Sequence, residues 1–294
     1  MIAAPRAQTK PGGEWPKPSA TLPPADVSLA GQDSNRLGGR LSVLSRQKAD
    51  HVALDRLLEQ LADTEPRRQD AVLRRIYRLV FPHAFAEEAV LWPAIRRVLP
   101  DGNDLTLRIE REHQQINALV TDLERLSPGS SRFRETLEQV VRLLREDVRD
   151  EEDALLPRLQ ERLSVTQLRL LGIAWEAVRR IAPTRPHPVV SRRPPGNVLS
   201  ALPLSIVDRS RDAIDRLIQH DARPARPLAA ISAGLTRAAH ATEYLPGMQR
   251  GEEPATWSGA RPDRRVRLAT LAVGIGAIAG VIAYRRRAAD RARA

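Results

Sequence analysis

The 294-residue chain contains no cysteine, and this absence removes several classes of site. Without a thiol there is no disulfide framework, no Cys-ligated zinc or iron–sulfur centre and no thiol nucleophile. Any metal must therefore be held by histidine and carboxylate side chains. Aromatic residues are also few, at 3% of the chain, which weakens the case for a surface that stacks nucleic-acid bases.

The formal net charge of +11 suggests a polyanion-binding protein until its distribution along the chain is considered. Residues 41–182 carry 23 basic and 24 acidic side chains, whereas residues 183–294 carry 19 basic and 9 acidic ones. The densest part of the positive excess flanks an apolar run at 268–284. We therefore expect no nucleic-acid partner and assign the excess to arginines that face anionic lipid.

Proline and glycine divide the chain into four segments. The first lacks an apolar period and an apolar core of signal-peptide length, so we expect no secretion and predict a disordered arm. The second is predicted to be a helical domain, the third a Pro/Arg-rich linker with weak helices, and the fourth a membrane anchor with basic flanks. The segments are 1–40, 41–182, 183–265 and 266–294, and the weak helices are expected at 203–219 and 227–242.

The helical domain consists of helix-forming stretches separated by turn signals, and it contains no useful segment with the alternating period of a β-strand. Four long helices joined by short turns predict an all-α, up-down-up-down four-helix bundle. A short fifth helix follows, with Ser164 as its N-cap. The expected helices cover 41–62, 66–99, 104–126, 131–162 and 164–181.

The second and fourth of these helices carry the same spacing of residue types. In each, a ligand-type residue is followed at offsets of 4, 5, 8 and 10 by Glu, Glu, Leu and Pro. His51 and His113 precede the two copies at similar distances, so the domain consists of two related helical hairpins. The prolines are predicted to end or kink the helices beyond the site. The first copy is His83, Glu87, Glu88, Leu91 and Pro93, and the second copy is Asp147, Glu151, Glu152, Leu155 and Pro157.

Helical geometry predicts that these titratable side chains lie inside the bundle. Residues four apart share one face of a helix, and on all four helices the titratable residues interrupt an apolar stripe. An isolated ionised carboxylate in such a core costs several kcal/mol unless a cation or a well-made pair stabilises it. A single core histidine is usually structural, but the repeat favours a metal, most simply two metals bridged by a carboxylate.

The sequence HAFAEEAVLWP at 83–93, with His51 before it and His113 after it, resembles the hemerythrin-like HHE cation-binding family over residues 41–182. The sequence APTRPHP at 182–188 is similar to a C-terminal extension of bacterial members. The resemblance implies a four-helix bundle that holds two iron ions in a non-haem di-iron centre with an oxo or carboxylate bridge. The matching ligand positions are His51, His83, Glu87, His113 and Glu151.

Two positions depart from the family pattern. Asp147 stands where the second HxxxE motif begins with His, and Asn117 stands one turn after His113, where the oxygen carriers have another His. With Asp147 as a sixth ligand, the set resembles a di-iron carboxylate site, which weighs against reversible O2 carriage. Asp55, Glu112 and Asn117 are predicted to support the ligands. The remaining histidines, His187, His220 and His240, are predicted to lie at the surface.

Residues Leu268–Tyr284 form a run of 17 residues without a charge, flanked on both sides by arginines. As a helix it spans about 26 Å, slightly less than the hydrocarbon core of a bilayer, and arginine flanks can extend a short span. Gly276 and Gly280 form a small-xxx-small pattern that indicates helix pairing and a homo-oligomer. We predict a single-pass anchor that holds the bundle in the cytoplasm. A helix folded back onto the bundle is the alternative, although the run has no polar face.

These features lead to three hypotheses about function. The first is a cytoplasmic, membrane-tethered di-iron protein that binds O2, NO or peroxide in sensing or a stress response. The second is a redox enzyme that uses the same iron to reduce peroxide or NO. An open iron position serves both purposes, so the sequence does not separate them. The third is a metal-free helical scaffold whose histidines are structural.

Overall fold

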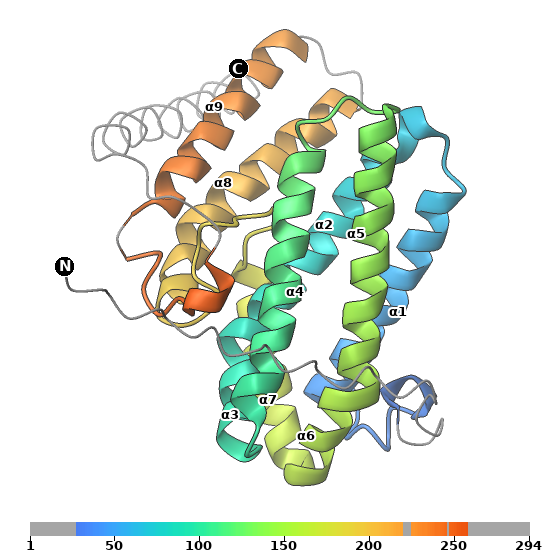
Figure 1. Ribbon diagram of the computed structural model, residues 1–294, viewed down its shortest axis with the longest axis vertical. Coiled ribbons are helices and arrows are strands. Elements are labelled where there is room, and N and C mark those ends of the chain that lie inside the picture. The colour runs from blue at the N-terminus through green and yellow to red at the C-terminus, as the bar shows by residue number, and fades with distance from the viewer. Residues whose placement is uncertain (1–27, 220–224, 246, 258–294) are drawn as a thin grey trace, which may run out of the picture.

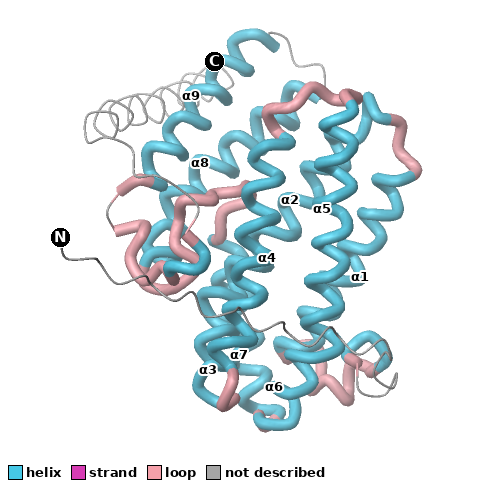
Figure 2. Tube along the Cα trace, in the orientation of Figure 1, coloured by secondary structure: helices cyan, strands magenta, loops and turns pink. Residues whose placement is uncertain are grey.

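The computed structural model describes residues 28–219, 225–245 and 247–257 (Figure 1). Within these ranges every regular element is a helix and no strand is present (Figure 2). The all-helical prediction is therefore confirmed for this part of the chain. The predicted membrane span at 268–284 lies outside the described residues. Among the helices that are described, none is long and apolar enough to cross a bilayer.

Four long helices form the central bundle: α1 (Val43–Ala62), α2 (Gln69–Ala86), α4 (Gly102–Leu123) and α5 (Ser131–Asp150). Short connections join them, so consecutive long helices run in opposite directions (Figure 1). The fifth helix, α7 (Val165–Ile181), packs against α1 and α2. Ser164 caps this helix as predicted, and Gln167 completes a capping box.

The second and fourth predicted helices are each interrupted by a π-helical turn. Turn η3 (Glu87–Leu91) leads from α2 into α3 (Trp92–Val98), and turn η4 (Glu151–Leu155) leads from α5 into α6 (Leu156–Arg162). Such single π turns inside α-helices are frequent at functional sites. Both copies of the sequence repeat thus take the same local structure.

The prolines of the repeat explain where these turns lie. Trp92 donates its backbone N–H to the carbonyl of Glu87, five residues earlier, and the equivalent bond in the second copy joins Leu156 to Glu151. The next residue is proline, which has no N–H and crowds the carbonyl four residues before it. The wider turn lets the chain continue as a helix past Pro93 and Pro157.

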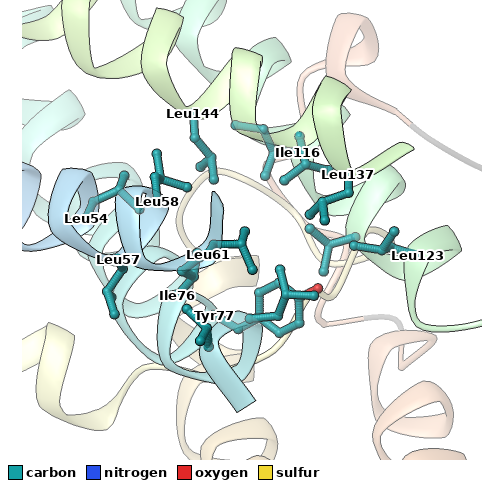
Figure 3. Packing of buried hydrophobic residues seen from close by; sticks show 14 of the residues in the cluster. Leu54, Leu57, Leu58, Leu61, Ile76, Tyr77, Ile116, Leu123, Leu137 and Leu144 are labelled. Atoms are coloured by element: carbon teal, nitrogen blue, oxygen red, sulfur yellow. The ribbon is translucent and has the colours of Figure 1, made fainter. Parts of the chain in front are cut away.

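Two apolar clusters fill the bundle, one at each end. In the first, the four long helices each contribute a buried residue, namely Leu58, Ile76, Ile116 and Leu144 (Figure 3). The second cluster includes Trp92 and Trp175. On every long helix, the predicted site residues lie along the sequence between the members of the two clusters. The apolar packing therefore holds the site at mid-height in the bundle.

Residues on both sides of the predicted domain also pack against it. Leu29 and Leu37 join the second apolar cluster, so residues 28–40 are ordered although the sequence predicts disorder. The predicted weak helices are present as α8 (Gly196–Gln219) and α9 (Ala225–Glu243), which pack on one another around their own apolar cluster. Helix α8 also contacts α7, which gives the C-terminal region a partner that the sequence did not reveal.

Gly172 allows α7 to approach the start of α1 closely. A Cβ atom at this position would lie 2.0 Å from the carbonyl oxygen of Leu41 and 2.7 Å from the backbone nitrogen of Val43. We predict that Gly172→Ala lowers the free energy of unfolding by about 3 kcal/mol, because two backbones must separate.

Gly129→Ala is the matched control, since Gly129 has a φ of +85° but nothing within 4 Å of an added Cβ. Gly129→Ala should lower the free energy of unfolding by only about 1 kcal/mol, because it introduces backbone strain alone. Urea unfolding followed by circular dichroism measures both values. Equal losses for the two variants would contradict the close contact at Gly172.

Candidate metal centre

Six titratable side chains converge between the two apolar clusters. One group combines residues from α1, α2, η3 and η4, whose potential ligand atoms all lie within 4.8 Å of one another. A second group combines residues from α4, α5 and η4 under the same limit. The structure thus brings together all six residues that the sequence predicts for the site. The first group is His51, His83, Glu87 and Glu151, and the second group is His113, Asp147 and Glu151.

Glu151 belongs to both groups, so a single carboxylate lies between two sets of donors. Its Oε2 atom is 3.2 Å from Nε2 of His51. Glu87 also reaches both sides, with Oε1 at 3.1 Å from Nε2 of His83 and Oε2 at 3.7 Å from Nε2 of His113. Asp147 completes the second group, with Oδ1 at 3.5 Å from Nε2 of His113. Glu151 is therefore the carboxylate shared by the two groups, and Glu87 of the first group also approaches the second.

Several of the atoms that face this centre are buried without a hydrogen-bond partner among the described residues. Glu87 and Glu151 are 0% and 1% exposed, and burying unsatisfied polar atoms of this kind is costly. Imidazole nitrogen and carboxylate oxygen together form a donor set suited to iron and similar divalent metals. The residues present therefore fit a metal ion. The unpaired atoms include His51 Nε2, His113 Nε2, Asp147 Oδ1, Glu151 Oε1 and both carboxylate oxygens of Glu87.

The other ring nitrogen of each histidine contacts a carboxylate on the outer side of the centre. A carboxylate that accepts the Nδ1–H fixes the tautomer and leaves Nε2 free to bind a metal. This arrangement recurs at all three histidines, as expected of a metal centre. The contacts are His51 Nδ1 to Glu152 Oε1 at 2.9 Å, His113 Nδ1 to Glu88 Oε1 at 2.9 Å, and His83 Nδ1 to Asp50 Oδ2 at 3.2 Å.

These orienting carboxylates differ from the predicted supporting residues. Asp55 is exposed, and Glu112 pairs with Arg108. Asn117 is buried, but its amide donates to the backbone carbonyl of His113 and its Oδ1 accepts from the backbone N–H of His187. The sequence did contain a signal for two of the orienting acids, because both copies of the repeat have a second Glu directly after the ligand-type Glu.

The prediction that His187 lies at the surface is wrong. Its Nδ1 lies 3.0 Å from Oε1 of Glu243, its Nε2 lies 3.1 Å from Oδ2 of Asp208, and the residue is buried. The segment that carries it is enclosed by the bundle and the α8–α9 pair, so packing of the C-terminal region decides its burial. His240 is half-exposed, in agreement with the prediction, and His220 lies outside the described residues.

The C-terminal region also reaches the centre through arginines. Nη1 of Arg192 is 3.7 Å from Oε2 of Glu88, the carboxylate that orients His113. The side chain of Arg193 bonds both carboxylate oxygens of buried Glu110 on α4. Sequence reasoning missed these contacts because the partners are far apart along the chain.

The charges of the metal-free site are compensated by protons. Burial raises the pKa of Glu151 to about 8, and the negative charges of Glu87 and Asp147 add to this shift. Burial by itself would lower the pKa of His51, but the close carboxylates of Glu151 and Glu152 outweigh it and raise the pKa to about 9. Protons therefore occupy, at neutral pH, a centre where a metal would supply the positive charge.

We predict that metal binding at pH 7 releases two or more protons per chain. His51 and Glu151 have pKa values of about 9 and about 8, so both are protonated at pH 7 and must lose the proton to bind metal. Apparent affinity should therefore rise at least about 100-fold per pH unit between pH 6 and 7.5, because close carboxylates outweigh burial and also raise the pKa values of His83 and His113. Calorimetry with Co²⁺ in two buffers of different ionisation enthalpy measures the release. A value below one proton would contradict the prediction.

Comparison with known proteins assigns the central part of the chain. Residues 42–159 match the family described as "Hemerythrin HHE cation binding domain". An uncharacterized hemerythrin-like protein of Schizosaccharomyces pombe is 23% identical over 155 residues, which are 52% of this chain and 74% of that protein. A DNA nickase of Nostoc sp. is 25% identical over 133 residues, which are 45% of this chain but only 37% of the nickase. No solved structure matches the chain.

Proposed function

Because residues 42–159 belong to the hemerythrin HHE cation-binding family, we propose that the protein is a non-haem di-iron protein that binds O2, NO or peroxide in sensing or a stress response. The observation that carries this proposal is the position of Glu151, which belongs to two groups of ligand-type side chains. One shared carboxylate between two donor sets is the arrangement that a pair of bridged metals requires.

In this proposal the two groups hold one ion each. His51, His83 and Glu87 hold the first, His113 and Asp147 hold the second, and Glu151 lies between them. A bound iron pair supplies a redox-active centre at which small ligands bind. The protein aims the imidazoles through its outer carboxylates, and an apolar cluster packs on each side of the centre along the bundle.

Three of the six proposed ligands are carboxylates, and this proportion keeps a redox enzyme as the second candidate. Carboxylate ligands favour the harder, more oxidised states of iron, which suits the reduction of peroxide or NO. Consumption of added H2O2 by the iron-loaded protein, with an excess of ascorbate as the electron donor and metal-free protein as the blank, separates the candidates. Sustained consumption identifies an enzyme, whereas a single stoichiometric spectral change identifies a binding protein.

The nickase activity of the Nostoc relative is not carried over in this proposal. The match covers 37% of that protein, and residues 41–182 of this chain carry 23 basic and 24 acidic side chains. DNA binding depends chiefly on an excess of positive charge that neutralises backbone phosphates. The helical domain has no such excess.

We predict that His83→Ala lowers bound iron from about two ions per chain to fewer than one and also lowers the melting temperature. The substitution removes a proposed ligand and leaves the buried Glu87 without its imidazole neighbour. Elemental analysis and thermal unfolding of the purified protein measure the two effects.

His240→Ala, at the half-exposed histidine of α9, is the matched control. It should leave the bound iron and the melting temperature unchanged. Unchanged iron in His83→Ala would reject the proposed site. Less than about one iron in the unaltered protein, without a near-ultraviolet oxo-bridge absorption, would favour the metal-free scaffold.

We propose further that the run at 268–284 anchors the protein in the cell membrane, with the bundle in the cytoplasm and helix pairing through Gly276 and Gly280. Deletion of 261–294 should therefore move most of the protein from the membrane fraction to the soluble fraction. Deletion of 1–27, at the other end of the chain, should leave the distribution unchanged. An unaltered distribution in the first variant would reject the anchor.

A further inference from the structure

A cavity of about 1110 Å³ lies between α1 and α5 and has no role in the proposed function. Its floor is formed by buried leucines of the two helices, including Leu58 and Leu144, which lie close together in Figure 3. The other leucines of this floor are Leu54, Leu61 and Leu137. We call this cavity the α1–α5 groove. Its floor is the part of the first apolar cluster that α1 and α5 contribute.

The groove is long as well as large. Its lining follows α1 from Lys48 to Ala62, a distance of about 21 Å at 1.5 Å per residue. Sites for small organic ligands in proteins usually have volumes of about 300–1,000 Å³. The groove is therefore far larger than O2, NO or H2O2 requires, and its dimensions suit an extended chain molecule.

One wall of the groove is basic. Arg142, Arg145 and Arg149 of α5 line it, and their spacing of three and four residues places them on the same face of the helix. None of the three forms an ion pair with a carboxylate of the described residues. The α5 wall also carries Arg134 and a single acid, Glu138, whereas the α1 wall carries Asp55 and Glu59 beside Lys48 and Arg56. An anionic group is therefore attracted to the α5 side.

We infer that the α1–α5 groove binds a free fatty acid with an extended alkyl chain. The alkyl chain lies on the leucine floor, and the carboxylate pairs with the arginines of α5. An aliphatic chain without a head group would leave the basic wall unused, and a small anion would leave the floor unused. His51 and Glu152 also line the groove, so the bound chain lies beside the candidate metal centre. The inference goes beyond the proposed function and does not require a metal.

Displacement of cis-parinaric acid from the full-length, metal-free chain tests the inference. Octanoic, decanoic and dodecanoic acids are compared below their micellar concentrations. Each added methylene should tighten binding about fourfold, because it buries about one CH2 group on the floor. The methyl esters should bind about tenfold more weakly, because they lack the charge. Affinity that is independent of chain length would overturn the inference.

Two pairs of variants locate the ligand in the groove. Val52→Trp fills the groove at an exposed residue of its lining. Its control is Val198→Trp, at another exposed valine, which lies on α8 outside the groove. The side chains are 41% and 53% exposed. Arg142→Glu combined with Arg145→Glu reverses the basic wall, whereas Arg132→Glu alters the same helix outside the lining. The groove variants should bind dodecanoic acid at least about tenfold more weakly than the unaltered chain does. The affinity of the control variants should stay within about twofold of the unaltered value.

Three further outcomes would overturn the inference. Equal affinity in the groove and control variants, with unchanged melting temperatures, would place the ligand elsewhere. Binding that appears only after deletion of 258–294 would show that the chain's own C-terminal segment covers the groove. A dimer in sedimentation analysis that binds no fatty acid would show that a second copy covers it. Iron content measured on the same variants tests the di-iron proposal separately. The fatty-acid inference and the di-iron proposal can therefore fail independently.

Discussion

The structure depends on the burial of six titratable side chains at mid-height in a helical bundle. Their inward atoms include carboxylate oxygens and imidazole nitrogens that lie close to one another but form no hydrogen bond of good geometry within the described chain. Apolar packing on both sides makes the unsatisfied charge more costly. The arrangement is stable in a folded protein only if protons or metal ions supply the missing positive charge, and burial beside other carboxylates, which raises the pKa of Glu151, favours protons in the metal-free state.

Two π-helical turns position the buried glutamates of the centre. Each turn begins at a ligand-type glutamate, and each precedes a proline that cannot continue the regular α-helical hydrogen bonding. The turn also buries the next residue, so that Glu88 and Glu152 face the outer nitrogens of His113 and His51. The repeat therefore encodes both an inner carboxylate and an orienting carboxylate with one short sequence.

The C-terminal region adds a second set of charges to the bundle instead of acting as a linker. Arg192 approaches the orienting Glu88, Arg193 pairs with Glu110, and the backbone of His187 bonds to Asn117. These contacts lie on the side of α4, away from the α1–α5 groove with its leucine floor. The bundle is thus covered by its own chain at one face, while the groove at α1 and α5 offers a binding surface.

The sequence by itself determined the helices and the six converging residues, because both follow from local geometry. Turn signals mark the helix ends, and an i, i+4 spacing places two side chains on one face whatever the neighbours are. Only the tertiary structure decided that Asp50 faces His83, that His187 is buried between two acids, and that α1 and α5 leave a groove between them. These features depend on how far apart the helices lie, and that distance is set by the packing of side chains from distant parts of the chain.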